Sequence, residues 1–248
     1  MKTISSKRLS SAQVTACFTT RHGGISKVPY SDANLAFHVG DNPDDVLKNH
    51  DLLADKLGFN RHSLIHMRQI HSDKIVIVDE SLNFDTPPEC DALITNIPNI
   101  PLMVMSADCT GILIYDPIHK AIGAVHAGRA GALNGILPKT IEAMHQAFKS
   151  HKEDLHIVLG PSIGGCCYEV NETIAQECEK KGYANALRRE DEKVFLDVNT
   201  ILLAQLKELE IKNVEVINHC TSCRCDEYFS YRAEEQRTGR LAGVIILR

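Results

Sequence analysis

Residues 101–135 read PLMVMSADCTGILIYDPIHKAIGAVHAGRAGALNG, and this stretch decides how the chain folds. It contains three short apolar runs, PLMVMSA, GILIYD and AIGAVHA, which are bounded by polar or turn-forming residues. Such runs are typical of buried β-strands. Cys109 lies between the first two runs, and His126 lies near the end of the third. We therefore expect both side chains where strands end and loops begin, which is where catalytic groups are commonly held.

Further strand and helix patterns occur on both sides of this stretch. The clearest helix begins after the capping residues Asp41 and Asn42, carries Pro43 in its first turn and ends at Gly58. The periodicity predicts other helices over residues 134–150, 171–181 and 198–210, and strands over residues 14–20, 74–79, 92–95, 155–160 and 214–218, with two strand-like runs around Thr238-Gly239. Since no linker or repeat interrupts them, we predict one domain over residues 1–248 with a mixed α/β (α+β) fold.

The composition limits the class of protein. With 248 residues, 44% of them hydrophobic, the chain is long enough to bury a large core. The net charge is −5 and no basic stripe is interleaved with aromatic residues, which argues against nucleic acid and favours a small polar or anionic substrate. No apolar run approaches the roughly 20 residues that a membrane-spanning helix needs, and the N-terminus has no apolar signal segment. We therefore expect a cytoplasmic protein that does not bind membranes.

The cysteines and histidines offer several candidate metal sites. Nine cysteines without a secretory signal favour reduced thiols or metal ligands over a disulfide framework. Three sets of residues are candidates: His71 with Cys109 and His126, Cys220 with Cys223 and Cys225, and the pair His62 and His66.

The second and third sets are the weaker candidates. A structural zinc site normally has four ligands, often in two pairs, and neither a second Cys-x2-Cys pair nor a His pair accompanies Cys220. We therefore do not favour a metal there, and the roles of Cys166 and Cys167 stay open. His62 and His66 have the spacing of two ligands on a helix, but the sequence RHSLIH is too short to establish a helix. We interpret them as surface histidines.

The first set is compatible with two kinds of chemistry. Cys109 and His126 are expected at corresponding ends of neighbouring strands, and His71 is available as a third ligand. A His, Cys, His set leaves a fourth zinc position open, which is the pattern of catalytic zinc. The same thiolate and imidazole are also able to act as nucleophile and base without metal. Copper suits these ligands too, but none of the twelve histidines forms a His-x-His pair, which argues against multicopper electron transfer.

Two polar segments are candidates for binding an anion. Arg21 begins the turn RHGG after the first expected strand, where it is either a phosphate or carboxylate ligand or a solvated surface residue. Asn34 in the next loop is equally ambiguous. Residues 160–167, GPSIGGCC, form either a backbone anion site or a plain tight turn.

Several of these segments together resemble a known family. The motifs, in order, are FTTRHGGIS with Asn34-Leu35, QIHSDKI, CDALIT, ADCTGILIYD, AVHAG, LGPSIGGCCYEV and FSYRAEEQRTGR, and they extend from Phe18 to Arg240. In this combination the chain resembles the YfiH-like family, also called the laccase-domain or polyphenol oxidase family and described as purine nucleoside phosphorylases.

The resemblance implies a layered α/β/β/α sandwich of mixed sheets, similar to a cysteine-hydrolase fold. It implies zinc held by His71, Cys109 and His126, with copper as the alternative metal, in a monomer or small homo-oligomer. Family members split adenosine, inosine and methylthioadenosine with phosphate into base and ribose 1-phosphate, and they also deaminate adenosine. Copper-dependent polyphenol oxidation and metal-free hydrolysis by Cys109 and His126 are the alternative functions.

The implied reactions give roles to further residues. Arg21 and Arg232 are the cations expected at the phosphate, and Asn34 is a further substrate-binding residue. Asp108, next to the metal ligand Cys109, is expected to carry a proton or to support the metal ligands.

One segment departs from the family. Where the family reads His-Ala-Gly-Trp-Arg-Gly, residues 126–131 read HAGRAG, so that Arg129 replaces the tryptophan and Ala130 replaces the arginine. If the family arginine contacts phosphate or substrate, either Arg129 substitutes for it from the neighbouring position or the activity is shifted or lost. In the latter case the chain is a non-catalytic partner or sensor.

Overall fold

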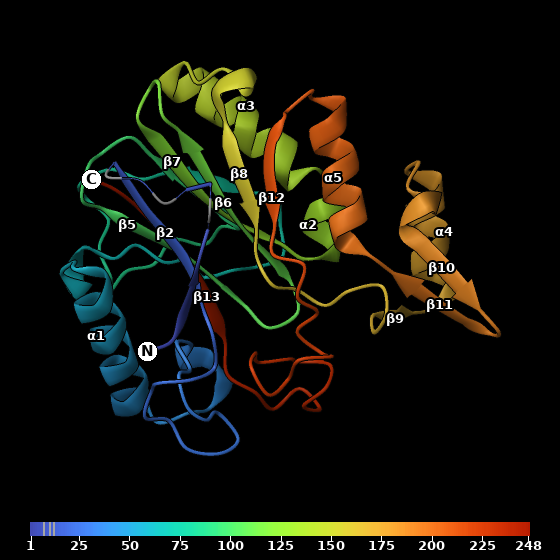
Figure 1. The fold of residues 1–248 in the computed structure, drawn as a ribbon, viewed down its shortest axis with the longest axis horizontal. Helices are drawn as coiled ribbons and strands as arrows, with labels where there is room; N and C mark the ends of the chain where they lie inside the picture. Colours follow the sequence, from blue (N-terminus) through green and yellow to red (C-terminus); the bar gives the residue numbers. More distant parts are fainter. Residues whose placement is uncertain (7, 10, 12) are drawn as a thin grey trace.

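Two β-sheets lie face to face at the centre of the protein, and helices cover both outer sides (Figure 1). The computed structural model describes residues 1–6, 8–9, 11 and 13–248. Within these residues, one sheet has six strands in the order β12-β8-β6-β7-β4-β3, and the other has four in the order β1-β2-β13-β5. Their strands are β1 (Thr3–Ser5), β2 (Val14–Thr19), β3 (Ile75–Ile77), β4 (Ala92–Thr95), β5 (Pro101–Ser106), β6 (Thr110–Asp116), β7 (Ala121–Ala127), β8 (His156–Leu159), β12 (Asn213–Val216) and β13 (Leu241–Leu247).

The helices agree closely with the sequence pattern. The α-helices of the described residues are α1 (Pro43–Leu57), α2 (Arg129–Leu133), α3 (Ile136–Phe148), α4 (Glu172–Lys180) and α5 (Val198–Glu208), and single 3-10 turns occur at Phe37–Val39, Arg61–Ser63, Lys152–Asp154 and Ala184–Ala186. Asn42 caps α1 as expected, because its side chain accepts a hydrogen bond from the backbone N–H of Asp44.

Alternation of side chains along the strands builds the layers. In β6, Ile112 and Ile114 face a core shared with α3 and α5, whereas Leu113 and Tyr115 face the core between the two sheets. On the outer side of the four-stranded sheet, residues of β13 such as Val244 pack against α1. The order helix, sheet, sheet, helix confirms the predicted α/β/β/α sandwich. The six-stranded sheet mixes parallel and antiparallel pairs, and the four-stranded sheet is antiparallel.

The three apolar runs of residues 101–135 form β5, β6 and β7, as predicted. β6 and β7 are antiparallel neighbours in the six-stranded sheet, but β5 belongs to the four-stranded sheet. The chain therefore crosses from one sheet to the other through residues 107–109. This crossing places Cys109 at the junction of the two sheets.

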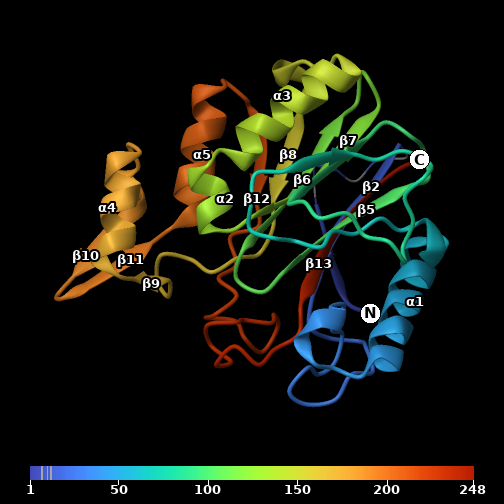
Figure 2. The ribbon, with the colours of Figure 1, turned by 180° about the vertical axis from the view of Figure 1, so that it is seen from behind.

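Two regions differ from the sequence prediction. A small sheet of β9 (Glu169–Val170), β10 (Leu187–Glu190) and β11 (Lys193–Leu196), in the order β10-β11-β9, was not predicted, because its strands are short and each contains charged residues. Figure 2 shows the hairpin formed by β10 and β11 beside α4, at one side of the molecule. Of the two strand-like runs expected around Thr238-Gly239, the first forms no strand, because residues 229–230 are irregular and residues 231–236 form turns, and only the second run forms a strand, β13. Among the described residues, no helix has both the length and the apolar character needed to cross a membrane.

Candidate metal centre

The fold brings together three residues that are distant in sequence. Cys109 directly precedes β6, and Gly111 of β6 pairs with His126 of β7, so the thiol and the imidazole lie at the same end of these strands. His71 comes from the loop before β3, on the other side of β4. The ligand atoms of His71, Cys109 and His126 all lie within 4.8 Å of one another. The two imidazole rings are 4.8 Å apart at 76°.

Asp91, which directly precedes β4, supports both histidines. Its fully buried carboxylate accepts hydrogen bonds from the backbone N–H groups of His71 (3.1 Å) and Ser72 (2.6 Å) and from the Ser72 hydroxyl (2.8 Å), and it lies 2.9 Å from His126 Nδ1. Burial raises the pKa of Asp91, but the bonds to His126 and Ser72 outweigh it and hold this pKa below its usual value. The ionised carboxylate only accepts, so His126 Nδ1 carries the proton and Nε2 keeps its lone pair for a ligand.

The pKa values of the two histidines are shifted in opposite directions. Burial lowers the pKa of His126, but the Cys109 thiolate and Asp91 outweigh this effect and raise the pKa to about 9. Burial, with the neighbouring charge of His126, lowers the pKa of His71. Protonation is therefore favoured at His126, whereas His71 is the more readily neutral imidazole.

The space between these ligands depends on a glycine. A Cβ atom at Gly128 would lie 3.0 Å from His71 Nδ1 and 3.1 Å from Cys109 Sγ. The absence of a side chain at Gly128 therefore keeps space open beside the Cys109 sulfur and the His71 imidazole. Sulfur and nitrogen donors of this kind are typical zinc ligands and also suit copper, so the residues fit a metal ion.

Two cavities flank the three residues and share part of their lining. The tyrosine cavity, of about 360 Å³, is lined by residues that include Cys109, Arg129, Ile163, Tyr168, Val198, Tyr231 and Arg232. The histidine cavity, of about 660 Å³, is lined by residues that include His38, His71, Cys109, His126, Tyr231 and Arg240. Cys109 lines both cavities. A substrate that occupies both spaces would therefore pass beside the thiol.

Arg240 is a candidate anion ligand that the sequence analysis missed. Its guanidinium donates to the carbonyls of Thr238 and Gly239 (both 3.0 Å) and lies over the Tyr231 ring at 5.4 Å. No carboxylate in the described part of the chain approaches it within 4 Å, unlike Arg21. Burial lowers the pKa of Arg240, whereas the Cys109 thiolate raises it. It is therefore a half-buried cation at the edge of the histidine cavity, and none of the described residues supplies a carboxylate counter-ion to it.

Arg21 and Asn34 line neither cavity. Arg21 pairs with Glu234 at 2.9 Å, donates to the Ser31 carbonyl at 3.1 Å and lies over the Phe229 ring. These contacts connect the N-terminal turn to the C-terminal loop.

Asn34 is fully buried and acts on the site through Arg240. Its Oδ1 accepts hydrogen bonds from the backbone N–H groups of Ala36 (3.0 Å) and Arg240 (2.9 Å), and its Nδ2 donates to Asp41 (2.9 Å). Asn34 therefore positions the backbone of Arg240, and with it the Arg240 guanidinium.

Asp108 and Arg232 both line the tyrosine cavity. The Asp108 carboxylate accepts hydrogen bonds from the hydroxyls of Thr221 (2.6 Å) and Ser230 (2.8 Å) and from the backbone N–H of Arg232 (2.7 Å). The Arg232 guanidinium donates to the Glu169 carbonyl at 2.9 Å and lies 5.1 Å from the centre of the Tyr168 ring. Asp108 therefore anchors the loop that holds Arg232, and its suggested part in proton transfer stays a prediction.

The unusual Arg129 begins α2 and faces the tyrosine cavity. Its guanidinium forms an ion pair with Glu177 at 2.8 Å. The positive charge of Arg129 at the cavity is therefore partly compensated by the Glu177 carboxylate.

The interpretation of His62 and His66 as surface histidines was correct for His62 and wrong for His66. His66 is buried, its Nε2 lies 3.0 Å from the Phe84 carbonyl, and burial lowers its pKa. Apolar neighbours that sequence spacing did not reveal, such as the Phe84 ring, enclose it.

Comparison with known proteins places this site in a family. The family model described as multi-copper polyphenol oxidoreductase laccase matches residues 15–248. A purine nucleoside phosphorylase of Corynebacterium glutamicum is 38% identical over 235 residues, with 94% of each chain covered. A purine nucleoside phosphorylase of Streptomyces coelicolor is 35% identical over 232 residues, covering 93% of this chain and 94% of the relative.

Solved structures give the same result. The hypothetical protein YfiH of Bacillus licheniformis superposes with a TM-score of 0.90 at 31% identity, covering 95% of this chain and 93% of that one. The Neisseria meningitidis protein NMB0706 superposes with a TM-score of 0.89 at 31% identity, covering 100% and 99%. The chain therefore belongs to the multi-copper polyphenol oxidoreductase laccase family.

Proposed function

We propose that this chain is a zinc-dependent purine nucleoside phosphorylase that acts on adenosine, inosine and methylthioadenosine and also deaminates adenosine. The observation that carries the proposal is the convergence of His71, Cys109 and His126 in the lining of the histidine cavity, with Cys109 also lining the tyrosine cavity. The similarity to relatives named purine nucleoside phosphorylase supports it.

The cavities suggest where the parts of a nucleoside bind. The tyrosine cavity offers Tyr168 for contact with a purine ring, with Ile163 and Val198 as apolar neighbours. The histidine cavity offers Arg240, whose charge has no protein counter-ion among the described residues. Phosphate would therefore bind at Arg240, which replaces Arg21 as the leading phosphate ligand, while Arg232 lines the tyrosine cavity proposed for the purine.

The chemistry of phosphorolysis matches this arrangement. A phosphate oxygen forms a bond to C1′ while the N-glycosidic bond breaks, and the bonding electron pair leaves with the base, which then takes up a proton. Positive charge develops on the sugar during this step, so the anionic phosphate held by Arg240 stabilises the transition state. Bound zinc would supply activation of a water molecule, which deamination at the purine C6 requires. The residues of the chain hold the site in shape, since Asp91 fixes the His126 proton on Nδ1 and Gly128 leaves space open beside Cys109 and His71.

The proposal is tested by incubating zinc-loaded protein with adenosine and phosphate. We expect adenine and ribose 1-phosphate, with a smaller release of ammonia. Cys109→Ala should abolish both reactions, and Cys225→Ser, at an exposed cysteine outside both cavities, should leave them unchanged. A wild-type protein that releases no more product than Cys109→Ala would contradict the proposal.

A metal-free cysteine hydrolase is the second candidate function. The observation that favours it is the position of the His126 imidazole within 4.8 Å of Cys109 Sγ, which is the arrangement of a cysteine nucleophile beside its base. Metal analysis of protein purified without added metal separates the two functions. A tightly bound zinc ion that is present in the wild type and lost in Cys109→Ala would remove the hydrolase.

A further inference from the structure

Four cysteines outside the candidate metal centre form a second cluster. Cys166 and Cys167 lie in the loop after β8, and Cys220 and Cys223 lie in the loop after β12. Their four sulfur atoms all lie within 4.8 Å of one another. The sequence analysis found no second pair to accompany Cys220, but the fold supplies one from a segment more than fifty residues earlier.

The sheet explains why these loops meet. β8 and β12 are parallel neighbours, with Leu159 paired to Val216 at their ends, so both loops leave the same edge of the sheet. Backbone hydrogen bonds then join the loops, since Ser162 N–H donates to the His219 carbonyl at 3.2 Å and Thr221 N–H donates to the Ser162 carbonyl at 3.0 Å. The thiols are therefore held together by regular backbone pairing.

The sulfur spacing fits a shared ion. Cys223 Sγ lies 3.5 Å from Cys166 Sγ and 3.3 Å from Cys167 Sγ. A zinc–sulfur bond of about 2.3 Å in a tetrahedron places the sulfurs about 3.8 Å apart, whereas a disulfide bond requires about 2.0 Å. Cys223 is close to two partners at once, which suits a cluster of ligands better than a single disulfide. The backbone N–H of Gly164 also donates to Cys220 Sγ at 3.3 Å, which stabilises a thiolate.

We propose that Cys166, Cys167, Cys220 and Cys223 bind a second metal ion, of the soft divalent class to which zinc belongs. Four protein ligands complete a tetrahedral shell and leave no open position, so the site is structural rather than catalytic. Cys225 is exposed and lies outside the cluster, which makes it a matched control.

The position of the site gives the ion a mechanical role. Thr221, between two of the proposed ligands, donates to Asp108, and Asp108 accepts from the backbone N–H of Arg232. An ion at the cysteines would therefore hold the loop that presents Arg232 to the tyrosine cavity. Its loss should loosen that loop without emptying the His71, Cys109 and His126 centre.

The test is metal analysis of the full chain after zinc loading and removal of excess ion. We expect two zinc ions per chain in the wild type and in Cys225→Ser, and one in Cys166→Ser/Cys223→Ser and in Cys109→Ala. An unchanged zinc content in Cys166→Ser/Cys223→Ser relative to wild type would overturn the proposal. The readout is independent of enzyme activity, so it fails or succeeds separately from the proposed phosphorylase.

A second measurement keeps the cluster intact and so does not depend on how the double variant folds. In His71→Ala/Cys109→Ala the first centre is disabled, and X-ray absorption of the zinc that remains should show four sulfur neighbours at about 2.3 Å. A titration with cobalt(II) should give the intense thiolate charge-transfer absorption of a tetrathiolate site. Absence of bound ion in this variant, or nitrogen and oxygen neighbours in place of sulfur, would refute the second site.

Discussion

Asp91 holds both histidines of the candidate metal centre through one buried carboxylate. Replacing it in Asp91→Asn should lower zinc affinity about 10- to 100-fold, because an amide also donates and favours the wrong tautomer of His126. Competition with a chromophoric chelator measures the affinity. Asp79→Asn, at an exposed aspartate, is the control and should bind as wild type does. Equal affinities in the two variants would mean that Asp91 does not orient the ligands.

We expect Arg21 to stabilise the fold and Arg240 to bind substrate. Arg21→Ala breaks a largely buried ion pair with Glu234, so it should lower the free energy of unfolding by about 1–3 kcal/mol. Arg240→Ala should mainly raise the KM for phosphate, because its guanidinium has no carboxylate partner among the described residues to lose. Urea unfolding and phosphate-dependent initial rates measure the two effects. A larger rise in the KM for phosphate in Arg21→Ala than in Arg240→Ala would reverse the assignment.

At the residue scale, sequence patterns pointed to the candidate ligands but not to the residues that position them. Cys109 and His126 were expected together because strand ends are visible in apolar runs. Asp91 was missed, although it is the second residue of the motif CDALIT. Its role depends on contacts with Ser72 and His126, which come from other segments of the chain. Arg240 was missed because what distinguishes it from Arg21 is the lack of a counter-ion, which only the structure shows.

At the scale of elements, α1 carries a buried histidine that should make stability depend on pH. His50 Nε2 lies 2.8 Å from the Leu35 carbonyl, its Nδ1 has no hydrogen-bond partner among the described residues, and its ring stacks on Phe37. Burial lowers the pKa of His50 to about 3, with further lowering by His66 and Arg61. The folded state therefore binds fewer protons than the unfolded state between about pH 3 and pH 6.5.

Stability should consequently be full above about pH 6.5 and fall as the pH is lowered toward 3. Between pH 7 and pH 5 this histidine should remove about 2 kcal/mol from the free energy of unfolding. Urea unfolding at both pH values should show this loss in wild type and in the control His62→Gln, at an exposed histidine, and a smaller loss in His50→Gln. The idea fails if His50→Gln loses as much stability on acidification as the wild type.

Elements with strong periodicity were predicted well, and elements that depend on tertiary contacts were not. The apolar strands β5, β6 and β7 and the capped helix α1 have signals within their own sequence. The hairpin of β10 and β11 reads LRRE and KVFL, and each run is only four residues long, with LRRE mostly charged, so neither indicates a strand by itself. The run FSYR resembled a strand, but its backbone instead supplies a donor to Asp108.

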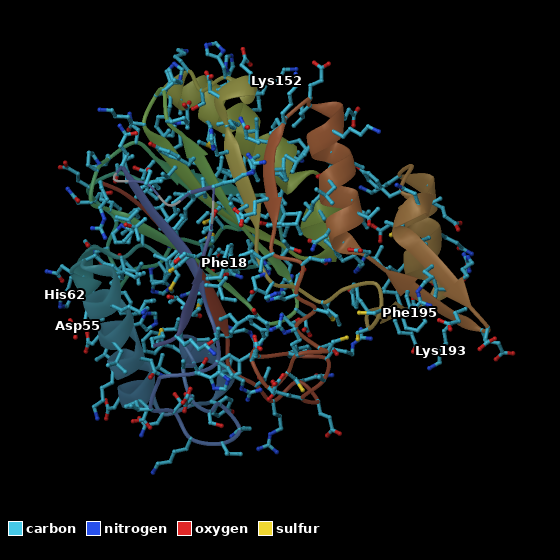
Figure 3. All side chains as sticks on the ribbon, in the orientation of Figure 1. Phe18, Asp55, His62, Lys152, Lys193 and Phe195 are labelled. Carbon is cyan, nitrogen blue, oxygen red and sulfur yellow. The ribbon has the colours of Figure 1, made fainter. Side chains whose placement is uncertain are left out.

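At the scale of the whole molecule, the two sheets meet around Phe18 of β2, which Figure 3 labels near the centre of the fold. The resemblance to a family, rather than periodicity, predicted this sandwich, because apolar runs do not show which strands share a sheet. Phe18 pairs with Gly243 of the neighbouring strand β13, where a Cβ atom would lie 2.7 Å from the ring. A Cβ atom at Gly160, which follows β8 of the other sheet, would overlap the same ring. The Phe18 ring therefore sets the separation of the two sheets at a point where Gly243 of one sheet and Gly160 beside the other leave room for it.

This contact should appear as a strong energetic coupling between the sheets. Gly160→Ala should lower the free energy of unfolding by about 1–3 kcal/mol through overpacking, and Phe18→Leu should lower it by leaving space. In Phe18→Leu/Gly160→Ala the new methyl group enters that space, so the double variant should be more stable than the sum of the single effects by about 0.5–3 kcal/mol. Gly123→Ala, whose Cβ would contact Ile94 and Ile114 and not Phe18, is the control and should combine additively with Phe18→Leu. Urea unfolding of the six proteins gives both cycles, and additivity at Gly160 as well as at Gly123 would show that the ring does not set the spacing of the sheets.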